Sequence, residues 1–450
     1  MAARLLLAFY GDDFTGSTDA LEALSLAGLK AVLFLAPPDK ALLTERFPHI
    51  QCIGVAGTSR AMSTAEMDTQ LAPVLRELWR LGAPLLHYKV CSTFDSAPAI
   101  GNIGHVVDIA RRDLNAGRYI SVLAGVPQLR RYTVFGNHFA AAGEEVHRLD
   151  RHPTMSRHPT TPMHESDLRI HLARQSQAPV SLMSVIDLDG DAQTVGVRQA
   201  QRLQASPGML LYDVLDEPRL QTAGRLIWEE AQRHTHVVVG SSGVEYGLAA
   251  HWRSSGMIPQ HARAFPRPAP VSQILVMSGS ASPMTAQQIA WAGDNGFDTL
   301  RAPAEHLVEP ARAHAAIEVL LDRAGKSLAS GRSVVVYSAS GPDDPSLGAT
   351  RSLVPAGEST TRSLGRAMGL MTRTLLERYA VRRVVIAGGD TSSYAAQEIG
   401  LEALEMQAEI APGAPLCRGH SRDRRIDGLE IALKGGQMGK VDYFGQARGM

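Results

Sequence analysis

Short, continuous apolar runs separated by amphipathic segments recur along this chain, and this alternation constrains its fold more than any other feature. Runs without strict polar–apolar alternation are typical of parallel strands that are covered on both faces. Amphipathic segments such as 18–28, 62–81 and 219–233 lie between them. The pattern predicts an α/β fold of three-layer units with mostly parallel sheets. In the first half, the expected strands are 5–10, 31–36, 52–56, 85–90, 119–124, 181–188, 209–214 and 236–239.

A proline-rich stretch interrupts this pattern and predicts two domains. At 450 residues, the chain is longer than one ordinary core supports. Four prolines fall within residues 259–271, and proline favours an extended linker. The strand–helix pattern then restarts, with strands expected at 274–277, 333–337, 384–387 and 429–433. We therefore expect domains at 1–258 and 272–450 with a ligand cleft between them; the alternative is a surface loop within one large domain.

Charge and cysteine content indicate the surroundings of the chain. Lysine plus arginine equals aspartate plus glutamate at 45 each, which gives no indication of a nucleic-acid or anionic-membrane partner. No apolar run is long enough to span a bilayer, and residues 5–10 resemble a buried strand more than a signal peptide. The three cysteines are far apart, which favours a reducing compartment such as the cytoplasm.

Two adjacent carboxylates, Asp12 and Asp13, follow the first expected strand and precede a helix. Ligands of open α/β sheets bind at the carboxyl ends of the strands. There the two carboxylates can accept hydrogen bonds from sugar hydroxyls, and one of them can act as a general base. The alternative is a turn with a helix cap, because aspartate commonly serves that purpose.

Polar residues also follow the next strands. Arg60 follows the third, where its planar fork suits a substrate carboxylate, although an arginine opening a surface helix is often simply solvated. Lys89 ends the fourth, where an ammonium group can offset charge on a transferring phosphoryl group. The remaining candidates for substrate contacts are Ser92, Thr93, Pro127 and Gln128. Arg130 and Arg131 follow in a loop that can close over a small polar ligand.

Three glycine-rich turns follow strands in the second half, and together they favour a nucleotide site. Glycines expose backbone amides, and helix N-termini carry partial positive charge, so both features bind phosphate oxygens. A single such turn is weak evidence, because glycines also end strands for steric reasons. Asp390 is a candidate to help hold magnesium or to cap a helix, and the metal ligands stay unidentified. The turns contain Ser278, Gly279 and Ser280; Gly388, Gly389, Asp390 and Thr391; and Lys434, Gly435 and Gly436.

The ordered set of these motifs resembles the four-carbon acid sugar kinases, a family once of unknown function. The resemblance covers nearly the whole chain and adds Asp19 and Ser59 to the residues above. It implies an N-terminal domain for the acid sugar and a C-terminal domain for ATP. The chain departs from the commoner pattern at Cys91, which replaces an aspartate, and at Asp95–Ser96, which replaces an Arg–Gly pair. Residues 9–19 and 148–159 look like the branch associated with 3-oxo-isoapionate.

These observations predict a kinase that uses ATP and Mg²⁺ to phosphorylate a hydroxyl of a small acid sugar. The candidates are 3-oxo-isoapionate and four-carbon acids such as 3-oxo-tetronate, threonate or erythronate. Asp13 or Asp12 would be the base, Lys89 would stabilise charge and Arg60 would hold the substrate carboxylate. A homodimer is expected only from the general frequency of symmetric oligomers. The alternatives are a non-catalytic acid-sugar sensor with a degenerate nucleotide half, or an acid-sugar dehydrogenase or epimerase.

Overall fold

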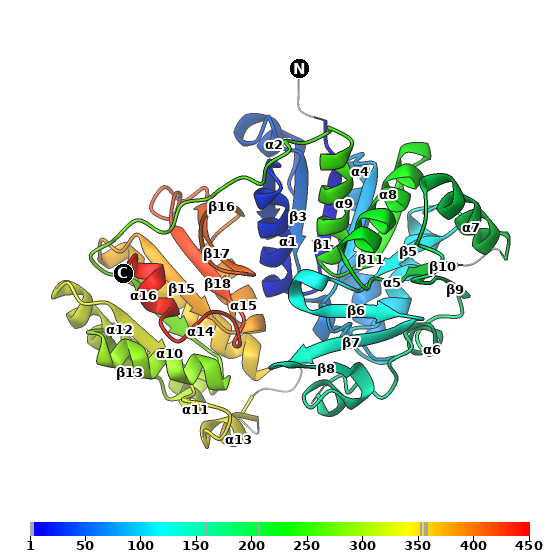
Figure 1. Ribbon diagram of the computed structural model, residues 1–450. Coiled ribbons are helices and arrows are strands. Elements are labelled where there is room, and N and C mark those ends of the chain that lie inside the picture. Colours follow the sequence, from blue (N-terminus) through cyan, green and yellow to red (C-terminus); the bar gives the residue numbers. More distant parts are fainter. Residues whose placement is uncertain (1–3, 159, 206–207, 352, 355–358) are drawn as a thin grey trace. The chain divides into compact units, whose positions relative to one another are not determined.

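The computed structural model describes residues 4–158, 160–205, 208–351, 353–354 and 359–450, and it divides into two compact units (Figure 1). The first unit comprises the chain up to Ala31 together with Ala36–Arg263. The second comprises Val32–Leu35 and Ala264–Met450. Each unit is an α/β fold with a mostly parallel sheet, as the alternating pattern predicted.

The sheet of the first unit has the strand order β3-β1-β4-β11-β5-β10-β9, and neighbouring strands are parallel. The central strands are continuous apolar runs because helices cover both faces, and β1, β4 and β11 are buried throughout. The strand bounds are β1 (Leu7–Gly11), β3 (Cys52–Ala56), β4 (Leu85–Lys89), β5 (Ile120–Leu123), β9 (Val180–Met183), β10 (Met209–Tyr212) and β11 (His236–Gly240).

Over one face of this sheet, α1 contacts α9, and α9 contacts α8 (Figure 1). Over the other face, α4 contacts α5. Several begin at a polar side chain that accepts a hydrogen bond from the first turn, such as Asp13 before α1 and Asn102 before α5. The helices are α1 (Phe14–Leu26), α2 (Lys40–Arg46), α3 (Thr64–Glu66), α4 (Ala72–Arg80), α5 (Ile103–Asp113), α6 (Leu168–Ala173), α7 (Ala192–Gln204), α8 (Glu217–Arg233) and α9 (Gly243–Ser254).

A small antiparallel sheet follows β5 in the chain. It consists of β6 (Arg131–Val134), β7 (Asn137–Ala142) and β8 (Glu145–Arg148). Phe135 and Gly136 make the tight turn between β6 and β7 with positive φ angles of 50° and 82°. The carboxylate of Asp213 accepts hydrogen bonds from both of their backbone amides, at 2.6 and 2.9 Å, and this fixes the turn.

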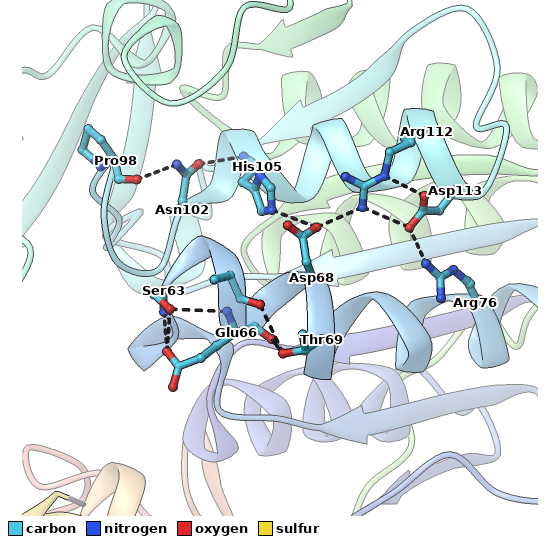
Figure 2. Close-up of polar contacts among 11 residues, drawn as sticks. Ser63, Glu66, Asp68, Thr69, Arg76, Pro98, Asn102, His105, Arg112 and Asp113 are labelled. Atoms are coloured by element: carbon cyan, nitrogen blue, oxygen red, sulfur yellow. Dashed lines mark hydrogen bonds and ion pairs between the residues drawn. The ribbon is translucent and has the colours of Figure 1, made fainter. Parts of the chain in front are cut away.

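A surface network joins the segment around α3 and α4 to α5 (Figure 2). Asp68 lies in the π-helical turn Met67–Leu71 and pairs with His105 at 3.2 Å and with Arg112 at 2.9 Å. Arg112 and Arg76 both pair with Asp113. Most of these side chains are well exposed, so the pairs contribute little free energy each.

The sheet of the second unit has the order β13-β14-β12-β15-β18-β17-β16-β2. The first five strands are parallel, while β17, β16 and β2 follow as antiparallel neighbours. The strand bounds are β2 (Ala31–Phe34), β12 (Leu275–Ser278), β13 (Asp298–Arg301), β14 (Val334–Tyr337), β15 (Arg383–Ala387), β16 (Ala403–Ala411), β17 (Ala414–His420) and β18 (Glu430–Lys434). The helices are α10 (Pro283–Asp294), α11 (Ala304–Val308), α12 (Pro310–Ala329), α13 (Ser346–Arg351), α14 (Thr360–Arg378), α15 (Gly389–Ile399) and α16 (Tyr443–Arg448).

Several details differ from the sequence-based expectations. Strand β2 was expected among the parallel strands of the first half, yet it pairs antiparallel with β16 and belongs to the second unit. The strand expected over 181–188 ends at Met183, where Ser184 and Asp187 form a hydrogen-bonded turn. Six strands went unpredicted because polar and charged residues interrupt their apolar pattern, namely β6, β7, β8, β13, β16 and β17. The loop expected at Arg130 and Arg131 therefore gives way to β6 at Arg131.

In the part of the chain that the structure describes, no helix is both long and apolar enough to cross a lipid bilayer.

Candidate active site

The carboxyl ends of β1, β3, β4 and β11 lie side by side at one edge of the first unit's sheet. Gly11 pairs in register with Ala56 and Lys89, and Lys89 pairs with Gly240. Backbone hydrogen bonds continue past the strand ends, from Asp12 N to Lys89 O at 2.8 Å and from Arg60 N to Asp12 O at 3.1 Å. The structure therefore brings Asp12, Asp13, Arg60 and Lys89 together, although they are far apart in sequence.

The two adjacent carboxylates have different environments. Asp13 caps α1, because its Oδ1 accepts a hydrogen bond from Gly16 N at 2.9 Å, and its Oδ2 lies 2.8 Å from Arg60 Nη2. Asp12 is buried, and its Oδ1 has no hydrogen-bond partner among the described residues. Burial, together with the negative charge of Asp13, raises the pKa of Asp12 to about 8. A carboxylate with a near-neutral pKa and an unused oxygen suits a general base better than one held in an ion pair.

Lys89 is buried beneath these carboxylates. Its Nζ lies 3.6 Å from Asp19 Oδ2 and donates to Val90 O at 3.1 Å. Burial by itself lowers the pKa of Lys89, but the charges of Asp19, Glu245, Asp12 and Asp13 outweigh it and raise that pKa, so the ammonium stays charged. A Cβ at Gly16 would lie 2.5 Å from Asp13 Oδ1 and 3.2 Å from Lys89 Nζ. Glycine at that position is therefore needed for the close packing of this cluster.

The segment after β4 faces Arg60. Thr93 Oγ1 donates to Asp95 Oδ1 at 2.6 Å, and Asp95 Oδ2 lies 3.9 Å from Arg60 Nη1. The carbonyl of Ser92 accepts a hydrogen bond from His138 Nε2 of β7 at 2.8 Å, which ties this segment to the small antiparallel sheet. Burial raises the pKa of the Cys91 thiol to about 12, so this cysteine is poorly suited to act as a nucleophile.

Pro127 and Gln128 lie in a short 3₁₀ turn after β5. Gln128 lines a cavity of about 400 Å³ together with Ala23 and Leu26 of α1. Ala23 is ten residues beyond Asp13, which corresponds to roughly 15 Å along the helix axis. The structure thus places Gln128 beside the far end of α1, away from the cluster around Asp12.

Sequence reasoning missed a buried pair behind Lys89. His87 Nδ1 lies 2.7 Å from Glu245 Oε1, and His87 Nε2 lies 3.1 Å from Gly240 O. Both side chains are fully buried, and Glu245 Oε2 has no hydrogen-bond partner within the described part of the chain. The available signal was His87 itself, because an ionisable residue inside a buried strand requires a partner.

In the second unit, the three glycine-rich turns meet at one sheet edge. Ser278, Ala387 and Lys434 are in register at the ends of adjacent parallel strands. Gly279 N donates to Ala387 O, and Gly388 N donates to Lys434 O, both at 2.9 Å. Gly388 has a φ of 133°, which side-chain-bearing residues rarely adopt. The hydroxyls of Ser282 and Thr285 donate to Gly436 O at 2.6 and 2.8 Å, so the first and third turns are interlocked.

Two helices begin at this edge with their N-termini among the turns. Ser282 caps α10, and α15 begins at Gly389 directly after Gly388. Thr391 lies in the first turn of α15, and a Cβ at Gly279 would lie 2.6 Å from its methyl group. Backbone amides at helix N-termini form a favourable environment for phosphate oxygens. The side chain of Asp390 lies outside the described part of the structure.

Lys434 adds a positive charge to this edge. It is completely buried, and its Nζ donates to Thr285 Oγ1 at 3.1 Å and to Gly436 O at 3.4 Å. Its Nζ also lies 5.7 Å from the centre of the Tyr443 ring. Burial lowers the pKa of Lys434 to about 7, and no described carboxylate offsets that effect. An anionic ligand would supply the missing negative charge.

Comparisons with known proteins agree with this division of the chain. Residues 7–248 match the model of a sugar-binding N-terminal domain, and residues 275–444 match that of a nucleotide-binding C-terminal domain. The chain is 46% identical to the 3-oxo-isoapionate kinase of Paraburkholderia graminis, over 99% of this chain and 94% of that protein. It is 31% identical to the 3-oxo-tetronate kinase of Methylobacterium radiotolerans, over 99% of both chains.

Solved structures share the fold at lower identity. A protein from Salmonella typhimurium LT2 aligns with a TM-score of 0.78 and 22% identity over 98% of both chains. A Haemophilus influenzae protein aligns with a TM-score of 0.71 and 24% identity over 98% of this chain and 99% of that one. The two matching domain models and the full-length relatives agree with the predicted resemblance, and this chain belongs to the four-carbon acid sugar kinase family.

Proposed function

We propose that this chain transfers the γ-phosphoryl group of ATP to a hydroxyl of 3-oxo-isoapionate in the cytoplasm. One structural observation carries the proposal of a phosphoryl donor. Three backbone turns and two helix N-termini meet beside a buried lysine that has no carboxylate partner among the described residues. That combination suits a polyphosphate anion. The choice of acceptor is supported by the 46% identity to a 3-oxo-isoapionate kinase.

In this proposal, Ser278–Ser280, Gly388–Thr391 and Lys434–Gly436 bind the nucleotide. ATP would be used as its magnesium complex, because Mg²⁺ usually keeps several waters and is bound by phosphates with one or two side chains. The Oγ of Ser278 is buried without a hydrogen-bond partner among the described residues, so it is free to contact the nucleotide. Catalysis then depends mainly on positioning and on stabilising the negative charge that develops.

The acid sugar would bind at the edge of the first unit. Asp12 would accept the proton of the attacking hydroxyl, and Lys89 would offset the negative charge near the reacting oxygen. Because the pKa of Asp12 is raised to about 8, this group is largely protonated at neutral pH before substrate binds. Binding must therefore displace that proton, for example through a new hydrogen bond from the sugar hydroxyl to the carboxylate.

The proposal is tested by ATP-dependent phosphorylation with a panel of acids. ADP release is measured with 3-oxo-isoapionate, 3-oxo-tetronate, threonate and erythronate, and the products are identified by mass. We expect the highest kcat/KM with 3-oxo-isoapionate. Higher activity on a four-carbon acid would move the substrate assignment to that acid. Acid binding without any ADP release would favour the sensor, and a nicotinamide absorbance change would favour a dehydrogenase.

A further inference from the structure

We infer that Arg131, at the start of β6, receives the carboxylate of the acid sugar, and this inference rests on the proposed function. Arg131 is half-buried, and the hydrogen bonds that it donates within the described part of the chain go to backbone carbonyls. Its Nη1 donates to the backbone carbonyls of Leu129 at 2.8 Å, Arg130 at 3.3 Å and Ala141 at 3.5 Å. Its Nε is buried and has no hydrogen-bond partner among the described residues. An unsatisfied donor on a charged group is costly unless a ligand uses it.

Arg131 belongs to the β6–β7 hairpin, and His138 of that hairpin hydrogen-bonds to the segment after β4, whose Asp95 faces Arg60. The guanidinium lies within the electrostatic reach of the Cys91 and Asp95 side chains. Cys91 in turn lies within the electrostatic reach of Asp95, Arg60 and Asp13. Because Arg131 is half-buried, water solvates its charge incompletely, and this burial lowers the pKa of its guanidinium. A carboxylate bound here would therefore also lie near the carboxylates that are proposed to act on the hydroxyl.

Arg60 is less available for this role than the sequence suggested. Its Nη2 already pairs with Asp13 at 2.8 Å, and its Nη1 lies 3.9 Å from Asp95. A substrate carboxylate on Arg60 would have to compete with the residue that caps α1. Arg131 forms no ion pair with any described residue, so an anion can bind it without displacing another carboxylate.

The balance of charge also favours an additional cation. Within the described residues, the cluster holds the carboxylates Asp12, Asp13, Asp19 and Asp95 but only the cations Arg60 and Lys89. Protonated Asp12 reduces this excess but does not reverse it. An anionic sugar approaching such a group is repelled unless a further positive charge faces it. Arg131, which lies within the electrostatic reach of Asp95, supplies that charge.

The surrounding structure holds Arg131 in a fixed position. Its backbone forms a bridge with Val126 at the end of the β5 segment and pairs with Ala140 in β7. Asp213 fixes the turn of the same hairpin through the amides of Phe135 and Gly136. A preorganised guanidinium loses less conformational entropy when it binds a carboxylate than a mobile one does.

The test compares Arg131→Gln with Arg130→Gln. Arg130 is the matched control, because it is the adjacent arginine and its guanidinium donates at the surface to the carbonyls of Gly143 and Glu144. Each variant is assayed with the acid sugar and with an uncharged analogue in which a hydroxymethyl group replaces the carboxylate. We expect Arg131→Gln to raise KM for the acid by about 10- to 100-fold, as for loss of a charge-assisted pair, with little change in kcat. The uncharged analogue and the KM for ATP should be unaffected, and Arg130→Gln should behave as the parent protein.

Equal losses on the acid and on the uncharged analogue would overturn the inference, and so would a charge-selective loss in Arg60→Gln but not in Arg131→Gln. Arg131→Lys, which retains the charge and loses the planar fork, provides a second measurement if the glutamine variant folds poorly. Calorimetric binding of the acid without ATP separates this inference from the kinase proposal. If the parent protein binds the acid but releases no ADP, weaker binding by Arg131→Gln supports the carboxylate contact while the kinase proposal fails.

Discussion

The strand edges of the two units present different chemistry. At the edge of the first unit, charged side chains pair with one another, as Arg60 does with Asp13 and Lys89 with Asp19. At the edge of the second unit, the turns are joined by backbone groups and hydroxyls, and Lys434 is a buried lysine without a carboxylate partner among the described residues. The difference shows that one fold class can build a site from side-chain charges or from backbone dipoles. Substitutions that change a charge should therefore impair the site of the first unit most. Substitutions that add a side chain at a glycine should impair the site of the second unit most.

The largest expected effect is on catalysis at the first edge. Asp12→Asn should lower kcat by about 10²- to 10⁴-fold, because the proposed base can no longer accept a proton. Asp13→Asn is the matched comparison, since asparagine still caps a helix and the change removes only the charge facing Arg60. Steady-state kinetics and ATP binding are measured for both. A larger loss of kcat in Asp13→Asn than in Asp12→Asn would transfer the base to Asp13.

The second expected effect is on stability. Lys89→Met removes the cation that faces Asp19, so buried carboxylates lose their compensation. Breaking a buried pair in this way should cost about 3 kcal/mol of unfolding free energy, as measured by urea denaturation. The raised pKa of Asp19 indicates that its carboxyl group can take up a proton in the variant, so the loss should be smaller at pH 5 than at pH 8. Equal losses at both pH values would contradict this role of Lys89.

The third expected effect is on ATP binding, when a side chain is added to a glycine-rich turn of the second unit. A Cβ at Gly436 would lie 2.6 Å from Ser280 Oγ and 2.7 Å from Ser282 Cβ, which forces the interlocked turns apart. Gly436→Ala should weaken ATP binding by about tenfold or more, as expected for overpacking of a close contact. Gly293→Ala is the matched control, since its nearest neighbour would lie 3.6 Å away. Acid-sugar binding should be unchanged in both, and an unchanged ATP affinity in Gly436→Ala would remove this turn from the nucleotide site.

The pH dependence of ligand binding should differ between the two edges. Lys434 has a pKa lowered to about 7, so above that pH the nucleotide-free protein must take up a proton to present a charged lysine to phosphate. The dissociation constant for ATP should therefore rise by up to about tenfold per pH unit above pH 7. The pH dependence at Asp12 has the opposite sign. As the pH approaches about 8, the carboxyl group loses its proton, and kcat/KM for the sugar should rise.

Calorimetry in buffers of different ionisation enthalpy measures the proton uptake directly. Lys434→Met should abolish the uptake and flatten the pH dependence of ATP binding. Proton uptake that persists in Lys434→Met would assign it to another group.

The smallest effect on stability is expected in the surface network of Figure 2. Arg112→Gln removes the ion pairs with Asp68 and Asp113. The side chains of Arg112 and Asp68 are exposed to solvent, whereas that of Asp113 is mostly covered. The unfolding free energy should fall by about 1 kcal/mol or less, and salt should reduce that difference further. A loss as large as that of Lys89→Met would show that exposure does not separate the two kinds of ion pair here.

Much of the fold could be predicted because its signals are local. The strand over residues 52–56 was predicted with its observed bounds, and those of 85–90 and 384–387 within one residue, since buried parallel strands are short apolar runs. Strand β16 escaped prediction because polar residues such as Glu405, Gln407 and Glu409 interrupt its apolar pattern. The glycine turns were visible because a turn needs particular residues in order, whatever surrounds it.

The sequence by itself determined where the buried parallel strands next to the two sites lie and which chemical groups follow them, because those properties depend on neighbouring residues. Only the tertiary structure decided how these groups are paired. Asp13 is held by Arg60, and His87 meets Glu245 across 158 residues of chain. Burial and pairing depend on every element that packs around a group. Only the folded chain therefore shows that Asp12 Oδ1 and Arg131 Nε are buried without a hydrogen-bond partner among the described residues.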